Sequence, residues 1–132
     1  MQSFVPYLEK LAKDLGGSFL EYSDRSVVIT IPITAERFQS VAVNLKAQSG
    51  EDWLVITSKI CEMHEVDKEF TYFLEKHLEY LHARFIAQDN FLGVAAMARY
   101  RTLDEAICRE MLLEVATTAD HMEDELVGTD IN

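Results

Sequence analysis

Three stretches of the chain repeat apolar residues at steps of three and four, the spacing that aligns side chains on one face of a helix. The first stretch covers residues 3–15 and is followed by Gly16-Gly17, a common helix stop. The second runs from Lys68 to about His82, and the third from Thr102 to Leu126. We therefore predict three amphipathic helices, each with one side that must be buried.

The last of these stretches carries its own start signal. Thr102 stands three residues before Glu105, the spacing of a capping box in which two side chains satisfy free amide groups at a helix start. The expected buried face is apolar: Leu103, Ile107, Met111, Val115, Ala119, Met122 and Leu126, widened by Ala106, Leu112 and Ala116. The expected solvent face is mostly acidic: Asp104, Arg109, Glu110, Glu114, Asp120, Glu123 and Asp124. Such a helix covers a large apolar surface with one side and exposes its other side to solvent.

Between the first two helices the apolar pattern changes to a period of two, which is the period of a strand. We predict four strands, at 18–22, 26–34, 38–48 and 53–61. Short polar turns separate them, so the strands form an antiparallel meander. Pro32 cannot donate to a strand ladder, which places its end of the second strand at an edge or a bulge.

Residues 83–101 fit two interpretations. The run Val94–Ala98 is rich in alanine and has a high helix propensity. Asp89-Asn90 is instead a turn signal, which favours a hairpin with strands at 85–87 and 94–100. We predict the hairpin, and a helix that continues from about Leu92 is the alternative. The element order is then α-β-β-β-β-α-β-β-α, an α+β fold in which helices flank an antiparallel sheet.

The composition is that of one globular domain. The chain has 132 residues, 48% of them apolar and 27% charged, and we assign residues 1–127 to the domain and 128–132 to a loose tail. The net charge is −11, and residues 103–132 contribute −8 of it through nine acids and one arginine. Nucleic-acid binding is disfavoured, because phosphate contacts need clustered lysine and arginine. No run approaches the roughly 18 apolar residues that a membrane span needs.

The sequence contains no motif for catalysis or for binding a cofactor. Cys61 and His64 have the spacing of two metal ligands, but one such pair is half of a zinc site. His77 and His82 are five residues apart and do not share a helix face. The two cysteines make no disulfide framework and the first residues lack a signal-peptide pattern, so we expect a cytoplasmic protein with reduced thiols. We expect no enzyme activity, no bound metal and no cofactor.

Aromatic residues at half-exposed positions remain as candidates for a functional surface, because such side chains often anchor interfaces. The candidates are Trp53, with Val55 on the same face of the fourth strand, and Tyr72 and Tyr80 at the sides of the second helix. A place in the core is the alternative for each of them. We predict an interface that includes these residues.

The order of elements resembles the YbjN family, once called bacterial sensory transduction regulators, and the class I type III secretion chaperones that share its fold. The similar segments span nearly the whole chain: Phe19–Tyr22, Leu54–Ile60, Phe73–Phe85, Thr102–Glu105 and Ala116–Leu126. They are hydrophobic patterns and carry no catalytic residue. The alanine-rich segment Phe91–Ala98 departs from a typical member.

This resemblance implies a non-catalytic protein, often dimeric, that binds another protein. The chain is also too short to cover both faces of a six-stranded sheet, and uncovered apolar patches usually mark interaction sites. We therefore expect a protein-binding module that forms a homodimer, the commonest closed assembly. Two other functions stay open. One is a structural or assembly subunit with an obligate partner, and the other is a small-molecule binder or enzyme with a cleft between the sheet and the last helix.

Overall fold

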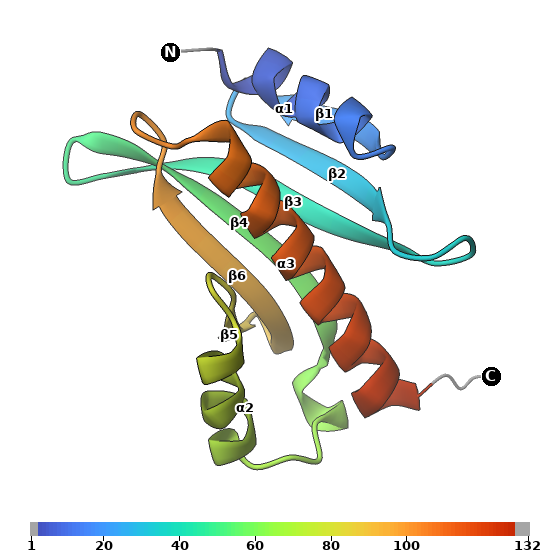
Figure 1. The fold of residues 1–132 in the computed structure, drawn as a ribbon. Coiled ribbons are helices and arrows are strands. Elements are labelled where there is room, and N and C mark those ends of the chain that lie inside the picture. The colour runs from blue at the N-terminus through green and yellow to red at the C-terminus, as the bar shows by residue number, and fades with distance from the viewer. Residues whose placement is uncertain (1–2, 129–132) are drawn as a thin grey trace.

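Strands with alternating buried and exposed residues form a six-stranded sheet in the computed structural model, which describes residues 3–128. The strands are β1 (Ser18–Ser23), β2 (Ser26–Pro32), β3 (Phe38–Gln48), β4 (Glu51–Glu62), β5 (Arg84–Gln88) and β6 (Phe91–Arg99). They lie in the order β1-β2-β3-β4-β6-β5, and all neighbouring pairs are antiparallel. The predicted meander is confirmed, and the closing hairpin extends it with β6 beside β4 and β5 at the edge (Figure 1).

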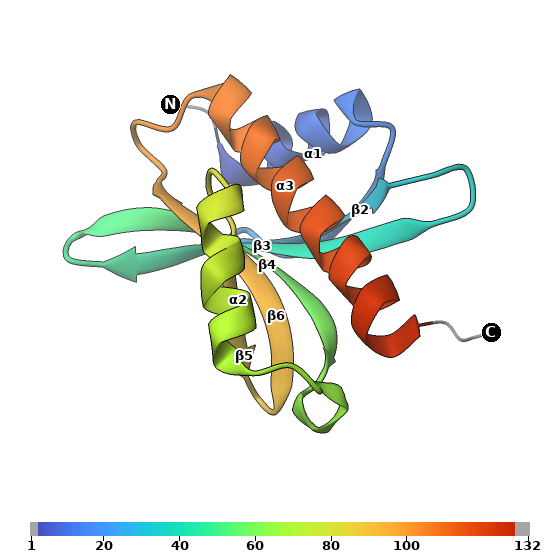
Figure 2. The same ribbon diagram turned by 60° about the horizontal axis from the view of Figure 1, so that its bottom comes forward.

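Helices cover one face of this sheet. The helix α1 (Phe4–Asp14) packs on β1 and β2, and α3 (Glu105–Glu123) crosses β3, β4 and β6. After a short turn, η1 (Met63–Glu65), the helix α2 (Phe70–Lys76) and the turn η2 (His77–Glu79) link β4 to β5. A final helical turn, η3 (Asp124–Gly128), extends α3. Figures 1 and 2 show the three helices on the same side of the sheet, which we call the inner face; the opposite side is the outer face.

The inner face holds the core. Alternate residues of the central strands are buried there: Val27, Ile29, Ile31, Val41, Val43, Leu54 and Ile56. The helix α3 packs onto them with side chains that are at most 1% exposed: Met111, Leu112, Val115, Ala116, Ala119 and Met122. The predicted period of two is therefore confirmed, and apolar side chains fill the space between α3 and the sheet.

The alternative of a continuous helix through the alanine-rich run is wrong. The strands β5 and β6 form a hairpin whose turn is Asp89-Asn90, and both turn residues have positive φ, 53° and 67°. A turn with two left-handed residues matches the twist of the paired strands, and Asp and Asn tolerate that conformation well. The turn chemistry thus outweighs the helix propensity of the alanines.

The start of α3 differs from the prediction. The N-cap residue is Asp104, whose carboxylate accepts a hydrogen bond of 3.3 Å from the Ile107 amide. Thr102 lies in the turn before the helix, where Leu103 donates its amide to the carbonyl of Tyr100. The buried face is also rotated from the expected one in the first turns, because Cys108 is fully buried while Ile107 is 39% exposed.

The expectation that Asp120 faces solvent is wrong, since this residue is only 7% exposed. Arg37, in the loop between β2 and β3, donates a hydrogen bond from its guanidinium to the Asp120 carboxylate and lies 3.8 Å from Asp124. A carboxylate that is taken out of water needs such a partner. The two residues are 83 positions apart, so the helix pattern alone does not reveal the pair.

Pro32 is the last residue of β2 and lies beyond Thr30, the last residue that pairs with β1, so its missing donor is tolerated as predicted. The second helix ends at Lys76 instead of near His82. Gly128 belongs to η3 and not to the tail, and residues 129–132 lie outside the described residues.

Among residues 3–128, no helix combines the length and the apolar character needed to cross a membrane.

Replacing Asp104 by alanine should lower the free energy of unfolding by roughly 0.5–2 kcal/mol, because the N-cap bond to the Ile107 amide is lost. Urea denaturation followed by circular dichroism measures the difference. The control is Thr102→Ala, which should change the free energy of unfolding by less than about 0.5 kcal/mol, as exposed substitutions usually do. A larger loss for Thr102→Ala than for Asp104→Ala would place the cap at Thr102.

Candidate protein-binding surface

The helix α2 and the turn after it expose four large apolar side chains. Phe70 is 76% exposed, Leu74 62%, Leu78 93% and Leu81 72%. We call these four residues the α2 patch. Single exposed apolar residues are ordinary on protein surfaces, but several on successive turns of one segment indicate an interaction site.

A single buried side chain, Phe73, anchors α2 on the sheet. Its ring meets the ring of Phe85 in β5 edge-on, with centroids 4.9 Å apart. The helical spacing of the segment predicts that the whole apolar stripe is covered by the rest of the chain. That prediction is wrong for the α2 patch, because α2 stands at the rim of the sheet and Phe73 is its one buried side chain, with Tyr72 partly buried against the core.

An apolar groove of about 330 Å³ lies between α2 and the edge of the sheet. Its lining includes Phe70 and Leu74 of the α2 patch together with Met63, Val66, Ile86 and Leu92. Among its lining residues, His77 is the one with an ionisable side chain. The size is that of a small ligand pocket, and the lining suits apolar side chains.

Glu114 of α3 fixes the chain that follows α2. Its carboxylate accepts hydrogen bonds from the backbone amides of Leu81, His82 and Ala83, at 2.9, 2.6 and 2.7 Å. Burial raises the pKa of Glu114, but the three donors outweigh this effect and hold the pKa below its usual value. The ring of His82 also contacts Glu110, with 2.6 Å between Nε2 and Oε1. The position of the α2 patch therefore depends on α3.

His77 holds the same turn from its other side. Its Nε2 accepts a hydrogen bond of 2.8 Å from the Phe85 amide, and its ring stacks on the Phe85 ring with centroids 5.5 Å apart. A nitrogen that accepts a hydrogen bond carries no proton, so this contact requires the neutral imidazole. Burial, and then the charge of Arg84, lower the pKa of His77 from its ordinary 6.5.

Two of the predicted interface residues, Tyr72 and Tyr80, belong to the segment that carries the α2 patch and are partly buried. The hydroxyl of Tyr72 donates to Glu125 of η3, and the ring of Tyr80 lies 5.9 Å from that of Phe85. Burial, followed by the bond to Glu125, raises the pKa of Tyr72 to about 12. Both tyrosines make internal contacts at the border of the α2 patch.

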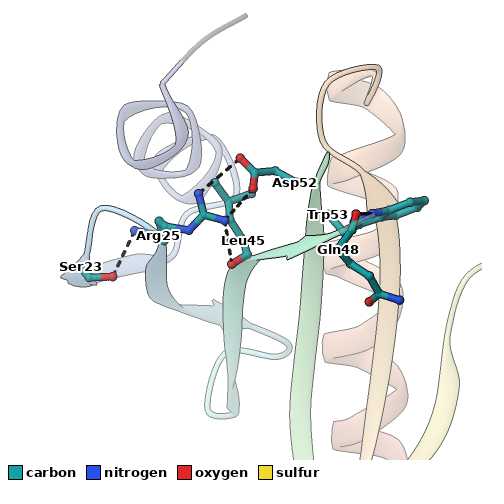
Figure 3. Close-up of polar contacts among 6 residues, drawn as sticks. All are labelled: Ser23, Arg25, Leu45, Gln48, Asp52 and Trp53. Carbon is teal, nitrogen blue, oxygen red and sulfur yellow. Dashed lines mark hydrogen bonds and ion pairs between the residues drawn. The ribbon is translucent and has the colours of Figure 1, made fainter. Parts of the chain in front are cut away.

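The other two, Trp53 and Val55, lie on the outer face and are half-buried. The indole N–H of Trp53 donates to the Gln48 carbonyl at 3.1 Å, and the Arg99 guanidinium lies 5.4 Å from the centre of its ring. Figure 3 shows the Trp53 ring directed away from the ion pair that Arg25 makes with Asp52, the neighbouring residue of β4. The structure thus separates the four predicted residues into two pairs on different surfaces.

Sequence reasoning does not single out the α2 patch, because helical spacing of apolar residues ordinarily predicts burial. The signal that points to it is the high density of large apolar and aromatic residues in this segment. Between residues 70 and 81 the chain places two phenylalanines, three leucines and two tyrosines. A helix of two turns at the rim of a sheet has one narrow buried side, so it cannot bury all of these side chains.

The structure also places the residues considered for metal binding or reactivity. Cys61 is buried, whereas the His64 side chain is 74% exposed, so this pair does not converge on one site. Residues 3–128 contain no group of three or more His, Cys, Asp or Glu side chains suited to a metal ion. Burial raises the pKa of Cys108 to about 11, which is typical of an unreactive core thiol.

No protein-family model matches the chain, and no curated protein matches its sequence. Solved structures do match its fold. The chain is similar to the crystal structure of the ExsC–ExsE complex at 13% identity, with 95% of this chain and 97% of that chain covered and a TM-score of 0.59. It is similar to the HopA1–SchA chaperone–effector complex at 10% identity, with 90% and 91% covered and a TM-score of 0.59. The predicted α+β, secretion-chaperone-like fold is confirmed, and membership of the YbjN family stays an expectation.

Acidification should lower the free energy of unfolding through His77. The pKa of this residue is lower in the folded chain than its ordinary 6.5, so the unfolded chain binds more protons as the pH falls. The contribution of His77 to the free energy of unfolding is fully present at a pH above its ordinary pKa of 6.5. It is lost as the pH falls through the lower pKa of the folded chain. His77→Gln keeps an acceptor for the Phe85 amide but does not titrate, so it should lose less stability between about pH 7.5 and pH 5.

Denaturation in urea at a series of pH values tests this expectation. His121→Gln is the matched control, because it makes the same substitution at a histidine whose side chain is 69% exposed. Equal pH dependence of the parent chain and His77→Gln would show that the Phe85 contact does not select the neutral imidazole.

Proposed function

We propose that this chain is a non-catalytic protein-binding module of the secretion-chaperone-like type and that it works as a homodimer. The observation that carries the proposal is the α2 patch, whose four side chains are 62–93% exposed on one short segment. Apolar surface in contact with water costs about 25 cal/mol per Å² relative to burial. Covering the α2 patch with protein is therefore favourable.

A second copy of the chain is the occupant that suits this surface. In a two-fold interface the same surface of both subunits meets, and a residue of one subunit contacts a different part of that surface on the other. The segment offers both halves of such a contact: Phe70 and Leu74 border the apolar groove, while Leu78 and Leu81 project beyond it. When two such segments pack antiparallel, the leucines of each copy can enter the groove of the other.

Charge also favours α2 over α3 as the surface where two copies meet. Residues 68–82 contain two lysines and three glutamates, a net charge of −1. Residues 103–126 carry eight acids and one arginine, a net charge of −7. Like charges brought face to face cost free energy and suppress association. Two copies therefore meet with little repulsion through α2 and with strong repulsion through α3.

Binding of a further protein is the chaperone-like part of the proposal. Both similar structures are complexes, and one of them is a complex of a chaperone with its effector. A shared fold alone does not establish a shared function, so these structures support the proposal by analogy. The resemblance to YbjN-type regulators implies a non-catalytic protein that binds another protein, and we propose that the dimer binds such a partner without catalysing a reaction.

The two other functions fit the structure less well. An assembly subunit with an obligate partner would use the α2 patch for that partner, and it becomes the better proposal if the chain alone is monomeric. A small-molecule binder or enzyme with a cleft between the sheet and α3 needs open space there. Met111, Val115 and Met122 fill that space with at most 1% of each side chain exposed.

The double variant Leu74→Glu/Leu78→Glu should be monomeric, because a dimer through the α2 patch would then bury carboxylates without partners. Light scattering at micromolar concentration should give about twice 15.1 kDa for the parent chain and 15.1 kDa for the variant. The matched control is Leu20→Glu in β1, at a leucine that is 55% exposed, which should keep the mass of the dimer. Circular dichroism verifies that each variant is folded.

Two results would contradict this expectation. A parent mass of 15.1 kDa at every concentration removes the homodimer and leaves an obligate partner to cover the α2 patch. A dimer that persists in the folded double variant places the interface on another surface.

A further inference from the structure

The outer face of the sheet carries no helix (Figures 1 and 2). It contains a hollow. The hollow has a volume of about 320 Å³ and reaches from β2 to β5. Its lining is mostly apolar or small and includes Val28, Ala42, Thr57, Ile86, Phe91 and Gly93. Gly93 is among the lining residues, and a Cβ atom on it would lie 2.9 Å from the Ser58 carbonyl oxygen, so a larger residue does not fit there. The surface can therefore receive side chains from another molecule.

The charge of this face is opposite to that of the whole chain. The pairing register places Lys46, Trp53 and Arg99 side by side on the outer face. It places Arg84 there as well, through Ala95 and Thr57. With Lys59 on the same side of β4 as Trp53, the strands present four cations on the outer face. Two strand residues on this face have the opposite charge: Glu51, 2.9 Å from Arg99, and Glu62, which pairs with Phe91 at the other end of β4. A chain of net charge −11 thus has a sheet face whose strand residues carry a net charge of +2.

These cations are available to a partner molecule. Within residues 3–128, no carboxylate lies within 4.0 Å of the charged nitrogens of Lys46, Lys59 or Arg84, although Asp89 lines one end of the hollow. The ammonium of Lys59 lies 4.2 Å from the centre of the Phe91 ring, so it stands over the apolar lining of the hollow. Exposed apolar side chains surround this region, with Leu20 55%, Tyr22 67% and Met97 56% exposed. The outer face therefore carries both exposed apolar side chains and positive charge.

We infer that the outer face binds an acidic amphipathic segment of a partner protein. Apolar side chains of the segment would enter the hollow, and its carboxylates would lie toward Lys46, Lys59 and Arg84. The inference rests on the proposed function, because it names the kind of partner that this protein-binding module takes. Complementary charge selects among partners and orients them. A basic segment would meet four like charges on this face and is rejected by it.

A synthetic peptide of about 15 residues, with leucine on one helical face and glutamate on the other, is the probe. One control peptide has lysine in place of every glutamate, and another has serine in place of every leucine. Trp53 is the only tryptophan of the chain and lies on the outer face, so its emission reports binding there without a label. Anisotropy of a dye-labelled peptide gives the affinity independently. The acidic amphipathic peptide should change the Trp53 emission and bind more tightly than either control peptide.

Charge reversal locates the binding surface. Lys46→Glu/Lys59→Glu should weaken binding of the acidic peptide by about tenfold, since two attractive pairs become repulsive. Lys10→Glu/Lys13→Glu on α1 is the matched control, with the same change of charge on the opposite side of the sheet, and should weaken binding much less. Circular dichroism and the mass from light scattering verify that fold and assembly are unchanged in both variants.

The outcomes separate this inference from the proposed function. Equal weakening by both double variants, equal or tighter binding of the lysine peptide, or preferential binding of a single-stranded oligonucleotide would each overturn the inference. The mass of the dimer and its loss in Leu74→Glu/Leu78→Glu do not depend on those results. If the α2 variant is monomeric but the acidic peptide does not bind, the homodimer stands and the outer face is not the partner surface.

Discussion

The packing of α3 across β3, β4 and β6 is the interaction on which the rest of the fold depends. Seven of its side chains, Cys108 included, are at most 1% exposed and form one layer with the alternating branched residues of the central strands. Ala116 and Ala119 within that layer are small, which lets the helix backbone lie close to the sheet. The chain has one other long helix, α1, and it also lies on the inner face. With its long helices on one side, the sheet keeps an outer face that the chain does not cover.

The position of α2 follows from the same packing. The edge strand β5 lies beyond β6, so the chain must leave β4 and return at the rim of the sheet. Phe73 is the one buried side chain of α2, and Tyr72 is partly buried against the core. Glu114 reaches from α3 to three successive amides after η2, and a charged acceptor makes stronger hydrogen bonds than a neutral one. An exposed apolar segment is in this way held in one place by a carboxylate of the core helix.

Most of the fold could be predicted because its signals are local. Each of the strands β2, β3 and β4 shows its period of two within about ten residues, and the hairpin turn depends on two adjacent residues, Asp89 and Asn90. The N-cap shows the limit of such signals, since Thr102 and Asp104 are both suitable caps and the turn at the end of β6 selects between them. Asp120 shows another, because its burial depends on Arg37 from a distant loop. Part of the candidate surface could be predicted from the sequence, since Trp53 and Val55 lie on a sheet face that no helix covers. The exposure of Leu78 could not, because it depends on how α2 packs at the rim of the sheet.

The separation of charge between the two sides of the sheet bears on how a partner would be selected. Acids dominate α3 and η3 on the inner side, while the strands carry four cations outward. At physiological ionic strength, charges separated by more than about 8 Å are largely screened. The net charge of −11 therefore repels an approaching acidic segment mainly at low salt, where long-range forces are not screened. Lys46 and Lys59 attract the segment once it is in contact with the outer face. Such a surface discriminates at short range, where apolar side chains must also fit the hollow. The same acidic body opposes contact between copies through α3 and leaves the nearly neutral α2 segment as the place where two copies can meet.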